Sequence, residues 1–280
     1  DALIDRVRDS ITVPLSLVEF EQVLLPVFKG VGDAHCRPEW PRSMRAALER
    51  EALLIPLQVK VLPDGVFVED ELKGFRSIPV GSRVISINSE PIAAIMERLL
   101  GTVVCDGANR TLAERVVERE FNVRYHLYVE RAGTFRVAYR TPDGEAGEKV
   151  VFGMTHAEIM NTRKPKGAAM LSWGSTVYPE RGVLWLTMNT LELDGLELGG
   201  QRPDRFIQAT LNEAFREQVR TVVIDVRGAG GRELSMAELV FSAIAKTPFK
   251  MLDGMVVRSI APPKDRPTHT IPESFYASSN

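Results

Sequence analysis

Apolar residues recur at the spacing of an amphipathic helix in five stretches of the chain. Ile92, Ile95, Met96 and Leu99 follow the i, i+3, i+4, i+7 pattern, which predicts a helix with one apolar face. The same spacing predicts helices over residues 3–28, 42–54, 204–219 and 233–245. A stretch with serine, threonine and proline at residues 10–14 predicts a bend inside the first of these helices.

Strands are predicted where short apolar or alternating runs lie between turn sequences. These runs cover residues 57–62, 66–68, 84–88, 125–129, 134–139, 149–152, 182–188 and 221–226. The last run is almost wholly apolar, which is typical of a central parallel strand covered on both faces. Loops are expected at residues 161–167, 195–200 and 227–231. The order strand, helix, strand, glycine loop and helix after residue 182 predicts an α/β layer.

The overall composition is that of a folded globular protein, with 280 residues of which 44% are hydrophobic and 26% are charged. A chain of this length predicts two or three folded units. The formal charge of −2 and the pI of about 6.2 give no basic surplus for binding nucleic acid. No apolar run approaches the roughly 18 residues of a membrane span, and no signal peptide is evident.

Two cysteines and four histidines limit the metal and disulfide chemistry of the chain. Cys36 and Cys105 lie 69 positions apart, and we expect both to be free thiols. The histidines are far apart in sequence, and no Cys-x-x-Cys or His-Glu-x-x-His motif is present. We therefore predict neither a metal ion nor another cofactor.

One histidine stands out by its position in the chain. His35 lies in the sequence Gly-Val-Gly-Asp-Ala-His-Cys, directly after the predicted N-terminal helix. A loop histidine is usually a surface or hydrogen-bonding residue. An imidazole also has the proton affinity that a general base needs near neutral pH, so both interpretations stay open.

The loop from Gly228 to Gly231 separates a predicted buried strand from a helix, so its backbone N–H groups can face a negative charge. A dinucleotide-binding loop would need a third glycine where the chain has Glu233, and the Gly-Lys-Ser/Thr of a phosphate loop is missing. Two interpretations remain. The loop is either a strand-to-helix turn that only glycine can make, or an oxyanion hole for acyl transfer.

Three segments, in matching order and spacing, resemble the tail-specific or C-terminal processing serine peptidases. Residues 32–36, Gly-Asp-Ala-His-Cys, are similar to Gly-Asp-Gly-His-Thr in the histidine-containing branch of that family. Residues 78–88 resemble its PDZ-type segment, and residues 223–231 resemble its Ile-Ile-Asp-Leu-Arg-Gly-Asn-Gly-Gly motif. The family is related to the tricorn-core and interphotoreceptor retinoid-binding proteins.

The resemblance implies a multidomain α/β protein with four parts. They are an N-terminal helical region at residues 1–54, a PDZ-like β-rich unit at 55–104, a β-rich connecting region at 105–165 and a partial ClpP/crotonase-like α/β core at 166–280. The implied function is a serine-type endopeptidase that acts on extended peptides or protein C-termini, in the periplasm or secreted. The alternatives are a non-catalytic peptide-binding homologue and a carrier of apolar ligands.

The resemblance also implies roles for individual residues. His35 is the expected general base, and Gly230 and Gly231 are the expected oxyanion hole. Three positions of the PDZ-type segment are expected to bind the polypeptide substrate: Val80, Gly81 and Ile85. Asp33 is expected from its charge and position to orient the base or to be structural. Asp225 and Arg227 are expected to form a structural ion pair that is buried at the end of the strand.

Two positions depart from the family motifs, because Ala34 and Ala229 stand where glycine and asparagine are usual. The nucleophilic serine of the family follows a further strand, so we expect it beyond Asn280. The polar tail of this chain offers three serines without a predicted strand before them: Ser274, Ser278 and Ser279.

Overall fold

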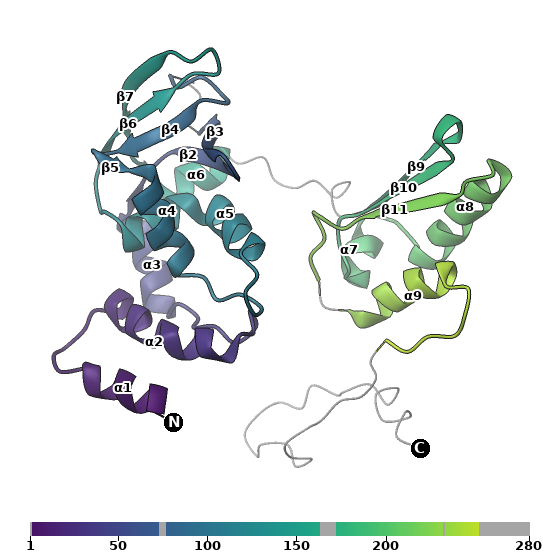
Figure 1. The fold of residues 1–280 in the computed structure, drawn as a ribbon, viewed down its shortest axis with the longest axis horizontal. Coiled ribbons are helices and arrows are strands. Elements are labelled where there is room, and N and C mark those ends of the chain that lie inside the picture. The colour runs from purple at the N-terminus through teal and green to yellow at the C-terminus, as the bar shows by residue number, and fades with distance from the viewer. Residues whose placement is uncertain (1, 73–76, 163–171, 232, 252–280) are drawn as a thin grey trace. The chain divides into compact units, whose positions relative to one another are not determined.

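The computed structural model describes residues 2–72, 77–162, 172–231 and 233–251. The chain forms two compact units, Asp1–Lys164 (unit 1) and Pro165–Asn280 (unit 2). Figure 1 shows that each unit has its own sheet and its own helices. None of the described helices is both long enough and apolar enough to cross a membrane.

Unit 1 begins with three helices, α1 (Ala2–Ser10), α2 (Leu17–Val31) and α3 (Arg42–Glu51). A capping box starts α2, because Ser16 and Glu19 each accept a hydrogen bond from the other's backbone N–H through their side chains. The helix ends at Gly32, whose left-handed backbone (φ 70°) costs glycine little. These signals place the turn that carries His35 at the C-terminal end of α2.

An antiparallel sheet forms the other part of unit 1. Its strands lie in the order β2 (Leu57–Leu62), β3 (Gly65–Glu71), β4 (Arg83–Ile87), β6 (Thr134–Arg140) and β7 (Ala146–Phe152), with β5 (Glu90–Pro91) paired to β4. The remaining elements are α4 (Ile92–Gly101), α5 (Thr111–Tyr128), α6 (His156–Thr162) and the paired β1 (Leu53–Leu54) and β8 (Met154–Thr155). The helices α4 and α5 pack on each other and on strands of the sheet (Figure 1).

One hydrophobic cluster joins unit 1 from α3 to α6. It joins Leu48 of α3, Val59 of β2, Tyr125 of α5 and Ile159 of α6, all of them buried. The rings of Tyr125 and Phe135 meet edge to face with their centroids 5.6 Å apart. Residues from all three regions expected before residue 165 therefore share one core. The boundaries of those regions stay a prediction.

Three sequence predictions for secondary structure are wrong in whole or in part. Residues 125–128 belong to α5 rather than to a strand. Phe121, Tyr125 and Tyr128 are buried at helical spacing, so the longer helical period overrides the short alternation of apolar residues at its end. The loop expected at residues 195–200 starts inside the short helix α7 (Leu193–Leu198). Of the loop expected at 161–167, residues 161 and 162 end the helix α6 instead, and residues 163–167 lie outside the described residues.

Unit 2 is a small α/β layer, as the order of its predicted elements indicates. Its sheet has the order β11 (Thr221–Asp225), β10 (Val183–Met188), β9 (Trp173–Tyr178), with β10 parallel to β11 and antiparallel to β9. The helices α7, α8 (Pro203–Arg216) and α9 (Leu234–Ile244) complete the core. There Leu186 and Met188 of β10 belong to the same buried cluster as Leu196, Ile207 and Val240 of the helices.

The predicted strand at residues 221–226 is confirmed as β11, but its predicted central position is not. In the described part of the chain β11 is an edge strand beside β10, and Val222 is 38% exposed. Ile224 packs against the core under the helices, whereas the neighbouring Val223 points to the opposite face of the sheet. An apolar run therefore marks this strand without marking its place in the sheet.

Candidate functional site

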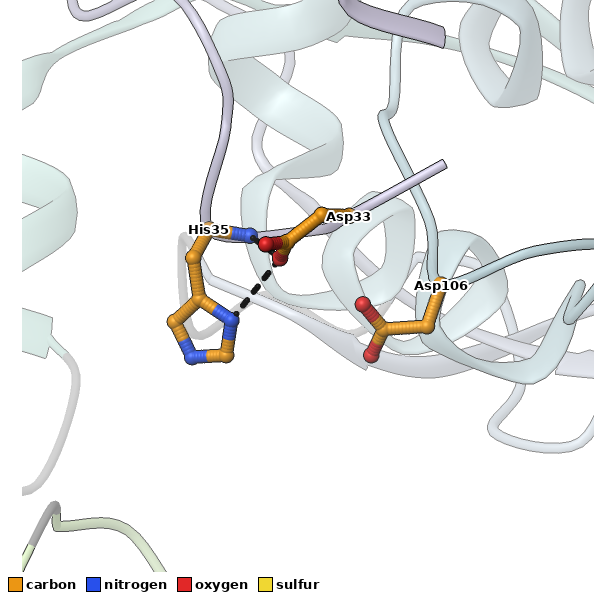
Figure 2. Close-up of side chains that lie close together, drawn as sticks. All are labelled: Asp33, His35 and Asp106. Atoms are coloured by element: carbon orange, nitrogen blue, oxygen red, sulfur yellow. Dashed lines mark hydrogen bonds and ion pairs between the residues drawn. The ribbon is translucent and has the colours of Figure 1, made fainter. Parts of the chain in front are cut away.

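The turn after α2 holds the candidate base. The Cys36 N–H donates to the Asp33 carbonyl oxygen at 3.0 Å, which closes a turn over residues 33–36. The Asp33 carboxylate accepts a hydrogen bond from the His35 backbone N–H at 2.8 Å, and the same oxygen lies 3.1 Å from Nδ1 of the His35 ring. Asp33 therefore holds both the backbone and the ring of His35 (Figure 2).

A second loop, between α4 and α5, runs beside this turn. The Gly107 N–H donates to the Gly32 carbonyl oxygen at 2.9 Å, and the Ala34 N–H donates to Asp106 Oδ1 at 2.8 Å. Figure 2 shows the Asp106 carboxylate beside Asp33 and His35. The sequence patterns do not single out Asp106, because its bond to the turn joins residues 72 positions apart.

The charges at this turn favour one role for His35. The hydrogen bond from the His35 backbone N–H holds the pKa of the Asp33 carboxyl below its usual value, and the bond to the ring lowers that pKa further. An ionised Asp33 beside Nδ1 favours the neutral tautomer in which Nε2 carries no proton. The side chain of His35 is 93% exposed, and Nε2 lies on the side of the ring away from Asp33 (Figure 2). In that tautomer Nε2 can accept a proton, and the role of His35 as a general base stays a prediction.

The same side chains could also hold a metal ion. Asp33, His35 and Asp106 each offer one ligand atom, and these atoms lie within 4.8 Å of one another. One imidazole and two carboxylates are suitable ligands for a divalent transition metal. All three residues are exposed, and both carboxylates already accept backbone hydrogen bonds that account for their positions. That this protein needs no metal stays a prediction.

In unit 2 the candidate oxyanion residues lie in the loop between β11 and α9. Gly231 has a φ of 123°, and a Cβ there would lie 2.7 Å from the Leu191 carbonyl carbon, so only glycine fits. A Cβ at Gly230 would meet open space, so the space around this position does not require glycine. Among the described residues neither glycine N–H has a hydrogen-bond partner, which leaves both free to donate.

The predicted ion pair of Asp225 and Arg227 is present at the start of the same loop. Arg227 donates from Nε to Asp225 Oδ1 at 2.8 Å and from Nη2 to Oδ2 at 2.6 Å. These side-chain bonds, and then the bond from the Arg227 backbone N–H, lower the pKa of Asp225 to about 2. The pair is buried on one side only: the Asp225 side chain is 12% exposed, whereas the Arg227 side chain is 82% exposed. It joins the last residue of β11 to the loop that follows the strand.

The three expected peptide-binding residues lie on β4 and the turn before it. Val80 and Ile85 are both about half exposed, at 50% and 44%. Gly81 has a left-handed φ of 81°, and its N–H donates to the Val68 carbonyl oxygen at 2.8 Å. That N–H is therefore already bonded to β3, whereas the two apolar side chains are open to a ligand. Their role in peptide binding stays a prediction.

Known structures give the comparison for this fold. Neither a scan of protein-family models nor a search of curated proteins produced a match. Mature CPAF matches with a TM-score of 0.50 and 15% identity over 80% of this chain and 48% of the CPAF chain. A serine-to-alanine mutant of CPAF and mature CPAF complexed with lactacystin each match with a TM-score of 0.51, 15% identity and 49% of the CPAF chain.

CPAF is a chlamydial protease of the tail-specific protease fold. At this identity the likeness concerns the fold: the chain is a mixed α/β protein with several sheets that resembles part of a serine protease. The chain spans about half the length of the CPAF chains that it matches. The serine protease itself therefore supplies no residue roles for this chain.

Proposed function

We propose that this chain is part of a serine-type endopeptidase that cleaves extended peptides or protein C-termini. One observation carries the proposal: on a fold shared with CPAF, the Asp33 carboxylate lies 3.1 Å from Nδ1 of an exposed histidine. His35 is the general base and Asp33 the residue that positions it. The substrate is a polypeptide, and the protein acts in the periplasm or is secreted.

The chemistry assigned to the turn is acyl transfer. Nε2 of His35 takes the proton of a serine hydroxyl as that oxygen attacks the peptide carbonyl, and later gives it to the leaving amine. The ionised Asp33 stabilises the imidazolium that forms in between. The backbone N–H groups of Gly230 and Gly231 are the proposed donors to the oxyanion, where each donor contributes about 2.7–4 kcal/mol.

The nucleophile is proposed to be a serine beyond Asn280. Of the serines in unit 2, Ser242 lies within α9 and donates its hydroxyl to the Leu239 carbonyl oxygen at 3.0 Å, as expected for a helix residue rather than a nucleophile. The three serines of the C-terminal tail lie outside the described residues: Ser274, Ser278 and Ser279.

The peptide-binding role is assigned to the sheet of unit 1. An extended peptide can add as a strand to the edge of a sheet, with backbone hydrogen bonds for affinity and side-chain contacts for selectivity. Val80 and Ile85 lie on β4 and the turn before it, and β4 lies between β3 and β6 inside the sheet. Their proposed contribution is therefore the apolar contact of their exposed side chains rather than strand pairing. In this proposal unit 1 captures the chain end and the α/β layer of unit 2 contributes to cleavage.

The test is peptide hydrolysis by the complete gene product and by its His35→Ala variant. We expect the variant to lose about 10²-fold or more in kcat, because a positioned base contributes that much. His156→Ala, in a helix of the same unit, is the control and should keep full activity. Unchanged peptide hydrolysis by His35→Ala would show that His35 is not the general base.

A non-catalytic peptide-binding homologue is the second candidate, favoured by Ala34 and Ala229 in place of the usual glycine and asparagine. Labelling with a fluorophosphonate probe separates the two: a peptidase is labelled at its serine and a pure binding protein is not. A carrier of apolar ligands is the third candidate, because a cavity of about 470 Å³ is lined largely by apolar side chains such as Val18, Met44 and Leu127. Another cavity has a volume of about 380 Å³, and charged side chains such as Arg37, Glu39 and Glu49 line it.

A further inference from the structure

The two loops beside His35 run in opposite directions and are tied together at two points. Gly32 bonds to Gly107 through the backbone, and Ala34 bonds to the Asp106 side chain. As the first loop advances from residue 32 to 34, its partner on the second loop moves back from 107 to 106. Cys36 lies two residues after Ala34 in the first loop, and Cys105 directly precedes Asp106 in the second, so both cysteines flank the tied residues.

The loops are also neighbours on the other side of the cysteines. The cavity of about 380 Å³ is lined by Arg37 and Pro38 from the first loop and by Val103 and Val104 from the second. Residues after Cys36 and before Cys105 thus line the same cavity. The two cysteines are 69 positions apart in the sequence.

Both cysteines are in a state that allows oxidation. They are free, and each is half-buried. Cys36 closes the turn of His35 through its backbone N–H, and Cys105 packs against the core of unit 1. Thiols of intermediate exposure are within reach of a small oxidant and are partly shielded from a second protein molecule.

We propose that Cys36 and Cys105 are a reversible disulfide pair that joins the two loops beside His35. With oxidised glutathione as the oxidant, one protein thiolate attacks the glutathione disulfide, forms a mixed disulfide and releases one glutathione thiolate. The second protein thiolate attacks the protein sulfur of the mixed disulfide and releases the second glutathione. Two protein thiols and one glutathione disulfide give one protein disulfide and two glutathione thiols.

The disulfide acts on the turn that carries the candidate base. Cys36 follows His35 directly, and the turn is otherwise held to the second loop by the two hydrogen bonds from Gly107 and Ala34. A covalent link one residue away fixes the separation of the loops when these bonds open. The formation of the bond is independent of the proposed peptidase function, whereas its effect on hydrolysis rests on that function.

The test is thiol–disulfide equilibrium of the full 280-residue chain with reduced and oxidised glutathione, in buffer and in denaturant. Protein is quenched, denatured and alkylated, and the cross-linked peptide is identified by mass spectrometry. We expect an intramolecular bond that is about 10²- to 10³-fold more stable against glutathione in the folded chain than in the denatured chain, the scale set by closing a loop of this length. Cys36→Ser and Cys105→Ser should each leave one thiol that stops at the mixed disulfide.

The outcomes that overturn the proposal are equally clear. Two free thiols, two separate mixed disulfides or cross-linked dimers in the folded chain would show that the loops keep the thiols apart. A disulfide that is equally stable in buffer and in denaturant would show that the fold does not bring the two thiols together. Hydrolysis is measured separately on the oxidised and reduced complete gene product, so a chain that forms the bond but shows no peptidase activity would refute the proposed function alone.

Discussion

Glu71 offers the sharpest test of how unit 1 holds its proposed peptide-binding segment. Its side chain is buried at 4% exposure at the end of β3. One carboxylate oxygen accepts three hydrogen bonds, from the Ser77 N–H at 2.6 Å, the Ser77 hydroxyl at 2.9 Å and the Ile78 N–H at 3.2 Å. These bonds anchor the chain just before Val80 and Gly81.

The cost of losing these bonds follows from the donors that remain. In Glu71→Ala the Ser77 hydroxyl can turn to water, but the two backbone N–H groups lose their acceptor, and Ile78 is fully buried. An unsatisfied buried donor costs about 1–3 kcal/mol, so we expect unit 1 to lose about 3–5 kcal/mol with the lost packing included. Glu71→Gln keeps an acceptor oxygen and loses only the charge. It should cost about 1–2 kcal/mol, since bonds to a charged acceptor are roughly twice as strong as neutral ones.

The assay is hydrogen exchange of the intact chain, read by mass spectrometry on peptides from the core of unit 1. Exchange through global opening reports the stability of that unit without a contribution from unit 2. Glu71→Ala should speed the slowest exchange by about 10²- to 10³-fold, at about 1.4 kcal/mol per decade, and Glu71→Gln by about tenfold. Equal effects of the two variants, or no effect of either, would refute the role given to the three bonds.

Two further predictions concern one residue in each unit. Burial, and then the charge of Arg131, lower the pKa of His126 against the opposing hydrogen bond with the Leu53 backbone. Just below pH 6.5 the folded chain then binds fewer protons than the unfolded chain, so unit 1 should lose stability as the pH falls through that value. In the same exchange assay, His126→Gln should weaken this dependence of stability on pH. Gly231→Ala should destabilise unit 2 by about 1–3 kcal/mol because of its left-handed backbone, whereas Gly230→Ala should be near neutral; thermal unfolding measures both, and equal losses would contradict the argument.

Local periodicity predicts the helices and strands well where one pattern dominates. The helix around Ile95 and Leu99 is confirmed as α4, and the strand pairs around the turns at residues 63–65 and 142–144 are confirmed as hairpins. Residues 125–129 mislead because this short apolar run contains two tyrosines and a valine, residue types that favour strands. The helical period becomes visible only when the window reaches back to Phe121.

The site is harder to predict because it depends on contacts between distant residues. His35 is found through its resemblance to the tail-specific peptidases, and the likeness to CPAF supports the fold behind that resemblance. The roles of His35, Gly230 and Gly231 stay predictions. Asp106 escapes sequence reasoning because a side chain 72 positions away meets the turn only after α4 and α5 have packed.

The single core of unit 1 has a consequence for how this protein can be dissected and how it can evolve. Many peptide-binding domains occur in different proteins because each has its own hydrophobic core and folds independently. Here a cut near residue 54 or 104 would leave Leu48, Val59 or Phe135 facing water on both fragments. We therefore expect that residues 55–104 alone do not fold as a transferable module, and that recombination within the first 164 residues is selected against as a folding defect.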